Sequence, residues 1–136
     1  MAPLATIEGV GKKYANTLAK HGIRTTQSLL KAGGSKKGRK ALASDSGVSE
    51  KLILEWVNRA DLMRVRGVGE EYSDLLEQAG VDTVKELRNR KPANLQAKMI
   101  DVNAARKVPF VRRPPSLGEV ERWVEHAKTL EPAVTY

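Results

Sequence analysis

Two stretches of the chain share one pattern: EGVGKKYANTLAKHGI from Glu8 to Ile23, and RGVGEEYSDLLEQAGV from Arg66 to Val81. The common frame is Gly-Val-Gly-x-x-Tyr-x-x-x-Leu-x-x-x-Gly, and the second copy follows the first at an offset of 58 residues. The copies differ just after the glycines, where Lys12-Lys13 in the first corresponds to Glu70-Glu71 in the second. A repeat of this length predicts a chain built from two related units.

A second block also recurs, further along each copy. EWVNRADL (Glu55–Leu62) resembles RWVEHAKT (Arg122–Thr129), with Trp56-Val57 matching Trp123-Val124. This offset is 67 residues rather than 58, so the second copy carries nine extra residues, which we place around KVPFVRRPP (107–115). The sequence therefore predicts one unit over residues 1–63 and a second over residues 64–136.

Helical patterns cover nearly all of the chain. Residues 50–63 and 117–130 each place their apolar residues, including Trp56 and Trp123, on one helical face. Thr25, Ser49, Thr83 and Ser116 are suited to cap helices that start just after them. Alternation typical of strands is absent, and KAGGSKKGRK (31–40) reads as a glycine-rich basic loop. We expect an all-α fold, with helix 50–63 running directly into the second unit and packing both units as one body.

Charge and composition narrow the function. The 136 residues carry a formal net charge of +8, which favours a polyanionic partner. Residues 1–63 hold 11 Lys and Arg against 5 Asp and Glu, whereas residues 64–136 hold 13 against 11. There is no cysteine, no signal-peptide pattern and no apolar run of about 18 residues. We therefore expect no membrane association and a cytoplasmic location, associated with the nucleoid if the source is bacterial.

The first Gly-Val-Gly stretch is suited to binding phosphate. Its glycines permit positive φ and close approach by another backbone, while the central valine points into the core. The helix that follows starts with unpaired N–H groups at the positive end of its dipole. We predict a phosphate site made of Gly9, Val10, Gly11, Lys12 and Lys13.

The sequence also resembles known families through these motifs. IEGVGKKYANTLAKHGIRTTQSLL, followed by LASDSGVSEKLILEWVNRA, resembles the helical N-terminal domain of RecA-like recombinases of archaea and eukaryotes. More broadly it resembles the double helix-hairpin-helix domains of repair proteins, a SAM-like fold. The tandem pattern, including DLMRVRGVGEEYSDLLEQAGVDTVKEL and the terminal EPAVTY, is similar to a bacterial domain-of-unknown-function family with helix-hairpin-helix character. These resemblances imply tandem helix-hairpin-helix units and suggest DNA binding, with the phosphate-contacting hairpin on the first copy.

We accordingly expect binding to nucleic acid, double-stranded DNA rather than RNA, through backbone phosphates and without sequence preference. Four further basic residues would extend the phosphate contacts: Lys36, Lys37, Arg39 and Lys40. In the second copy, Glu70 and Glu71 would each repel a phosphate about 5 Å away by about 1 kcal/mol in water. The same carboxylates stabilise the start of their own helix. We expect the second copy to keep the turn because Gly-Val-Gly is also a good way to connect and bury two helices.

A protein-interaction or self-assembling scaffold module is the alternative. Its contact surface would be the acidic second hairpin, formed by Glu70, Glu71, Asp74 and Glu77. Lys12-Lys13 of one molecule could meet Glu70-Glu71 of the next, a head-to-tail contact that closes a ring or grows a filament.

Catalysis has little support in the sequence, and a small-ligand or enzyme role is the weakest of the three hypotheses. No phosphate-binding loop, His-x-x-x-His helix or nucleophile elbow is present, so we expect no enzymatic activity, catalytic residues, metal or cofactor. His21 and His126 have no partners at metal-ligand spacing. Arg64 and Arg66 are best explained by the helix dipole, and the tyrosines and tryptophans of the repeat by packing.

Overall fold

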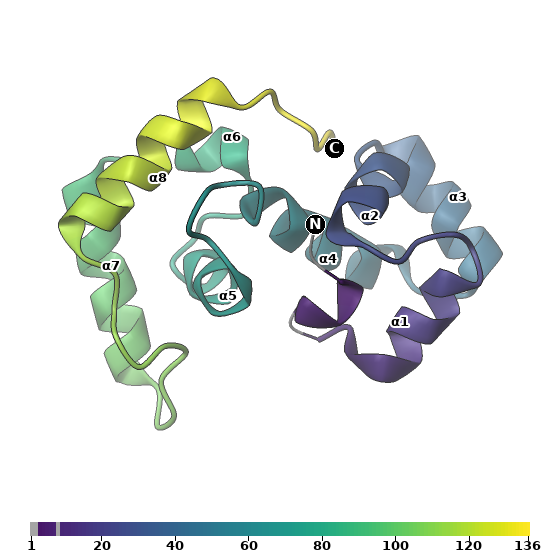
Figure 1. Ribbon diagram of the computed structural model, residues 1–136, viewed down its shortest axis with the longest axis horizontal. Helices are drawn as coiled ribbons and strands as arrows, with labels where there is room; N and C mark the ends of the chain where they lie inside the picture. Colours follow the sequence, from purple (N-terminus) through teal and green to yellow (C-terminus); the bar gives the residue numbers. More distant parts are fainter. Residues whose placement is uncertain (1–2, 8) are drawn as a thin grey trace. The chain divides into compact units, whose positions relative to one another are not determined.

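The computed structural model describes residues 3–7 and 9–136, so Met1, Ala2 and Glu8, where the first copy of the repeat begins, lie outside the described residues. Regular secondary structure in these residues is entirely helical, with eight α-helices and one short 3-10 helix (Figure 1). An isolated bridge pairs Pro3 with Thr25. The all-α prediction is confirmed for this part of the chain, and none of its helices is long and apolar enough to cross a membrane.

The chain divides into two compact units. The first comprises Met1–Asp61 together with Pro132–Tyr136, and the second comprises Leu62–Glu131. The C-terminal segment therefore packs with the first unit, whereas the sequence division at residues 63 and 64 groups it with the second.

The first unit contains the 3-10 helix η1 (Leu4–Thr6) and the helices α1 (Gly11–Ala19), α2 (Thr26–Gly33), α3 (Lys36–Ser46) and α4 (Glu50–Leu62). Its apolar core draws on every one of these elements. The fully buried large side chains of this unit are Leu4, Ile7, Leu18, Leu29, Ile53 and Trp56.

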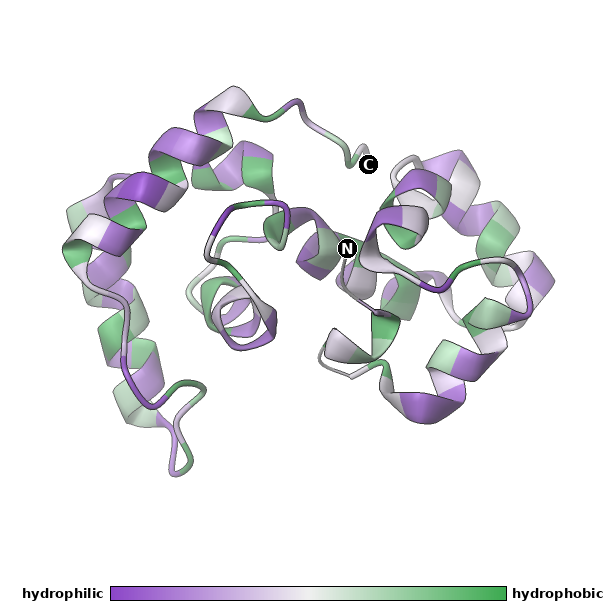
Figure 2. Cartoon of the chain, viewed as in Figure 1, coloured by the Kyte–Doolittle hydropathy of each residue, from purple (hydrophilic) through white to green (hydrophobic). Residues whose placement is uncertain are grey.

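The second unit contains α5 (Glu70–Gln78), α6 (Val84–Leu87), α7 (Pro92–Ala105) and α8 (Leu117–Thr129). α8 packs on α6 and α7, and α5 packs on α7. Figure 2 shows hydrophobic and hydrophilic residues side by side on α7 and α8, as expected for helices with one buried face. The largest members of this core are Leu62, Leu75, Leu76, Leu87, Leu95, Met99 and Trp123.

The local signals of the repeat occur in both units. Gly22 and Gly80 follow α1 and α5 with φ of +79° and +94°, the left-handed conformation that ends a helix. The hydroxyls of Thr25 and Thr83 then accept hydrogen bonds from backbone N–H groups three residues later, capping α2 and α6 as predicted. Ser116 caps α8 as predicted, and the side chain of Glu119 completes a capping box with it.

The loop prediction for Lys31–Lys40 is wrong. α2 extends to Gly33, and α3 begins at Lys36 after only two intervening residues. The hydroxyl of Ser35 caps α3 by accepting a hydrogen bond from the N–H of Gly38, at 3.0 Å. The glycines that indicated a loop serve close packing instead.

Like α3, helix α7 was not predicted from the sequence. It starts at Pro92, a favourable first helical residue, and buries Leu95 and Met99 one turn apart. In α8 the predicted apolar face is correct except at its start, where Leu117 is 40% exposed.

Candidate functional site

Each Gly-Val-Gly turn lies against a tryptophan. Gly9 and Gly67 both have a φ of +89°. A Cβ atom on Gly9 would lie 3.7 Å from Nε1 of Trp56, and one on Gly67 would lie 3.1 Å from Nε1 of Trp123. The first glycine of each turn is therefore required by backbone conformation and, in the second unit, also by space.

A tyrosine completes the same arrangement in each unit. The ring centroids of Tyr14 and Trp56 are 5.0 Å apart, as are those of Tyr72 and Trp123, with similar tilts. Both tryptophans are buried, which confirms their predicted role as core residues. The sequence repeat is thus a repeat of packing, in which turn, tyrosine and tryptophan fix where the next helix begins.

The start of α1 has the features of an anion site. α1 has no side-chain cap and no acidic residue in its first turn, where the lysines Lys12 and Lys13 are exposed. Lysines at the positive end of a helix dipole destabilise the helix by about 0.3–1 kcal/mol each. An anion at this position would accept hydrogen bonds from the free N–H groups and relieve that repulsion.

The second turn differs in backbone as well as in charge. Gly11 has a φ of +63° and is the first residue of α1, whereas Gly69 has a φ of −106° and precedes α5. Glu70 and Glu71 occupy the first turn of α5, where carboxylates stabilise the helix. The start of α5 therefore lacks the electrostatic imbalance found at α1.

The predicted acidic surface is already partly engaged within the protein. Glu70, Asp74 and Glu77 each take part in an interaction with other residues, while Glu71 is exposed.

The basic residues of α3 form a separate patch rather than an extension of the first turn. Lys36, Lys37 and Lys40 are exposed. In Figure 1, α1 begins at the lower edge of the first unit and α3 begins at its upper edge. Figure 2 shows both starting turns as strongly hydrophilic. Within this unit there are thus two basic patches, one at each helix start.

Arg39 does not belong to either patch. It is 4% exposed, and its guanidinium donates hydrogen bonds to the carbonyls of Gly33 and Gly34, both at 3.0 Å. A further hydrogen bond reaches the carbonyl of Thr135 at 2.5 Å, and the ring of Tyr136 lies 5.8 Å from the guanidinium carbon. Its predicted contact with nucleic acid is therefore corrected, because this side chain is occupied inside the first unit.

The C-terminal segment packs against the α2–α3 junction. The N–H of Thr135 donates to the carbonyl of Gly34 at 2.8 Å, and Val134 is buried. A Cβ atom on Gly34 would come within 2.4 Å of the carbonyl oxygen of Ala133, so only glycine allows this approach. The hydroxyl of Tyr136 donates to Oδ1 of Asn58 at 3.0 Å.

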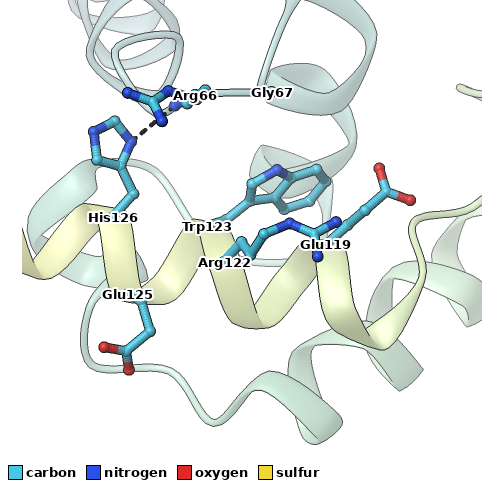
Figure 3. Close-up of a pocket in the computed structure, with 7 residues that line it drawn as sticks. All are labelled: Arg66, Gly67, Glu119, Arg122, Trp123, Glu125 and His126. Atoms are coloured by element: carbon cyan, nitrogen blue, oxygen red, sulfur yellow. Dashed lines mark hydrogen bonds between the residues drawn. The ribbon is translucent and has the colours of Figure 1, made fainter.

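A recess of about 400 Å³ lies beside the second turn (Figure 3). The N–H of Arg66 donates a hydrogen bond to Nδ1 of His126 at 2.9 Å, which fixes the ring against the turn. Two residues of the turn and five of α8 line the recess: Arg66, Gly67, Glu119, Arg122, Trp123, Glu125 and His126.

The two carboxylates of the recess already have basic partners. Nη1 of Arg113 donates to Oε1 of Glu119 at 2.8 Å, and Nζ of Lys128 lies 2.9 Å from Oε1 of Glu125. The hydrogen bond from Arg113, supported by the N–H of Ser116, lowers the pKa of Glu119, and the same contact raises the pKa of Arg113.

A family described as Domain of unknown function (DUF4332) matches the sequence over residues 8–130. The chain belongs to this family. No curated protein and no solved structure gives a significant match. The DUF4332 assignment covers both copies of the repeat and carries no activity of its own.

The recess is not predicted from the sequence of this DUF4332 chain, because Arg66 and His126 each have a structural explanation there. Comparing the copies provides a signal. At the offsets of 58 and 67 residues, Arg66 corresponds to Glu8 and Arg122 corresponds to Glu55, so the charge is reversed at both positions. In residues 3–7 and 9–136, no cluster of three or more His, Asp or Glu side chains is arranged to hold a metal ion.

Proposed function

We propose that this protein is a non-enzymatic nucleic-acid-binding protein that contacts backbone phosphates, DNA in preference to RNA, without reading sequence. In this proposal Gly9–Lys13 acts as the phosphate-binding turn of a helix-hairpin-helix unit. The observation that carries it is the start of α1, where an uncapped helix presents two exposed lysines and no carboxylate.

Three favourable terms would act on a phosphate at this position. The first N–H groups of α1 donate hydrogen bonds, the helix dipole attracts the negative charge, and Lys12 and Lys13 neutralise it. None of these terms depends on base identity, so binding should be independent of sequence.

The patch of Lys36, Lys37 and Lys40 supports a second phosphate contact. These lysines also lie at or near a helix start without an acidic residue in its first turn. Ser35 already caps that helix, so its lysines would act through charge rather than through free N–H groups. The second turn contributes no such contact at its tip, because Glu70 and Glu71 would repel a phosphate there.

Fluorescence anisotropy with a labelled duplex of about 30 base pairs, at low and moderate salt, tests the proposal. We expect salt-sensitive binding that Lys12→Glu with Lys13→Glu removes. If these lysines contact two phosphates, any residual binding should show a slope of log K against log salt that is smaller by about 2.

Lys51→Glu with Lys98→Glu is the matched control. Both pairs of substitutions lower the formal net charge by 4, from +8 to +4. Lys51 and Lys98 are exposed, but Lys51 lies in the first turn of α4, which Ser49 caps and which carries Glu50, and Lys98 lies in the interior of α7. We expect the control to retain most of its affinity. An equal loss in both variants would show that net charge alone drives binding and would contradict a phosphate site at the first turn.

The absence of duplex binding even at low salt would reject the proposal. The alternative of head-to-tail assembly then makes its own prediction. Self-association would be lost in the Lys12→Glu, Lys13→Glu variant and restored by adding Glu70→Lys and Glu71→Lys, as measured by analytical ultracentrifugation.

A further inference from the structure

The two units place their exposed cations at different points around the same turn. In the first unit the lysines follow the glycines, at the tip. In the second unit the tip carries Glu70 and Glu71, while Arg66 precedes the glycines and Arg122 lies on the neighbouring face of α8. The equivalents of these two arginines in the first copy are Glu8 and Glu55. Because packing against the tryptophan is the same in both units, it does not account for this exchange of charge.

The recess beside the second turn has an excess of positive charge. Its carboxylates, Glu119 and Glu125, are paired with Arg113 and Lys128, which lie outside the lining. Within the described residues, neither Arg66 nor Arg122 makes an ion pair within 4 Å. Two guanidinium groups therefore remain available to a negatively charged ligand.

The two guanidinium groups supply the hydrogen-bond donors of this recess. Nδ1 of His126 accepts the N–H of Arg66, so this ring nitrogen is already occupied, and Figure 3 shows the other ring nitrogen on the side of the ring away from Trp123 and Arg122. Figure 3 shows the guanidinium of Arg66 next to this ring, and Arg122 beside Trp123 and Glu119. Guanidinium groups bind phosphate and carboxylate oxygens in a fixed, two-pronged geometry, so the donors of this recess suit an oxyanion.

We propose that this recess binds an oxyanion of the phosphate class, held by Arg66 and Arg122. The site belongs to the second unit and does not depend on phosphate binding by the first turn. Its ligand is either a free phosphate group or a phosphodiester of a nucleic-acid backbone, which share the oxygen atoms that these donors recognise.

The two tryptophans give a separate reporter for each unit. Trp123 lines the recess, whereas Trp56 lies against the first turn. The indole N–H signals of the two tryptophans, once assigned, can be followed in two-dimensional nitrogen–proton NMR spectra while inorganic phosphate is added. Sodium chloride is lowered as phosphate is added, so that the ionic strength stays constant. A second titration uses a short DNA duplex in place of phosphate.

We expect a saturable shift of the Trp123 signal. Arg66→Gln or Arg122→Gln should weaken the binding measured at Trp123 by about tenfold, since each removes a charge-assisted hydrogen-bond donor. Arg112→Gln removes an exposed arginine of the same unit that does not line the recess, and should leave the affinity unchanged. A shift with inorganic phosphate supports a free phosphate ligand, and a shift with the duplex alone supports a backbone phosphodiester.

Two results would overturn the proposal. One is no shift of the Trp123 signal with either probe. The other is a shift that persists unchanged in both Arg66→Gln and Arg122→Gln. The Lys12→Glu, Lys13→Glu variant keeps this test separate from the proposed function, because its Trp123 signal should still respond while duplex contact at the first turn is lost.

Discussion

The guanidinium of Arg39 donates a hydrogen bond to the carbonyl of Thr135, 96 residues further along the chain. The same group holds the carbonyls of Gly33 and Gly34, so one buried side chain joins the α2–α3 junction to the C-terminal segment. Arg39→Ala should lower the free energy of unfolding by about 2–4 kcal/mol, because it leaves carbonyl groups without their charged donor. Urea denaturation measures this change.

A double-mutant cycle tests whether the loss arises through the C-terminal segment. Removing residues 132–136 should destabilise the first unit by itself, and adding Arg39→Ala to the truncated chain should cost less than it does in the full chain. Arg39→Lys keeps the charge but loses the forked set of N–H donors, so its stability should lie between those of wild type and Arg39→Ala. Strictly additive effects would show that Arg39 acts without the segment.

This contact also marks the limit of what the sequence could reveal. The repeat, the turn, the caps at Thr25, Thr83 and Ser116, and the buried tryptophans follow from local patterns and were predicted correctly. Arg39 looked like a surface cation because Thr135, one of its three acceptors, lies 96 residues away. The packing role of Gly34 was equally hidden, because the backbone that it accommodates, at Ala133, is also distant in the sequence.

The candidate sites also differ in whether they depend on local sequence or on contacts between distant residues. The lysines at α1 could be recognised because a turn and the helix after it are local. The recess required α8 to be placed beside Arg66, and the hydrogen bond from Arg66 to His126 joins residues 60 apart. Only the reversal of charge between the copies, at Arg66 and Arg122, offered a sign of it in the sequence.

The turn glycines should differ in their tolerance of a side chain. Gly67→Ala combines a positive φ with a Cβ 3.1 Å from Nε1 of Trp123, and should cost about 1–3 kcal/mol. Gly9→Ala should cost less, because its Cβ would have 3.7 Å to the indole of Trp56. Gly69→Ala is the control, since Gly69 has a φ of −106° and no atom within 4 Å of an added Cβ. Urea denaturation followed by tryptophan emission ranks the three, and an equal cost at Gly69 would contradict this account.

Asn103 fixes the segment that makes the second copy longer. Its buried side chain donates to the carbonyl of Val111 and accepts the N–H of the same residue, both at 3.1 Å. Asn103→Ala should cost about 2–3 kcal/mol by leaving both backbone groups unpaired. It should also speed tryptic cleavage in the segment, which contains Lys107 and Arg112.

Asn94→Ala, an exposed substitution on the same helix, is the control for that experiment and should alter neither quantity. Asn103→Asp retains the acceptor but loses the donor, so it should also expose the segment to trypsin. Cleavage that stays at the wild-type rate in Asn103→Ala would show that this pair does not hold the segment.

The ion pair between Arg113 and Glu119 should make stability depend on pH in the acid range. Because the hydrogen bond from Arg113 lowers the pKa of Glu119 in the folded protein, its contribution is present above the ordinary pKa of glutamate. That contribution is lost as the pH falls through the lowered pKa. Glu119→Gln should therefore be less stable than wild type at neutral pH, and the difference should vanish in acid. The loss of unfolding free energy should be smaller than in Arg39→Ala, because the ion pair is partly exposed. Glu119→Gln can retain the capping box, so its effect reports the lost charge rather than a lost cap. Arg113→Gln removes the other partner of the ion pair and should show the same pH dependence in thermal melts. A difference between Glu119→Gln and wild type that stays constant from neutral to acid pH would show that the charge of Glu119 does not stabilise the fold.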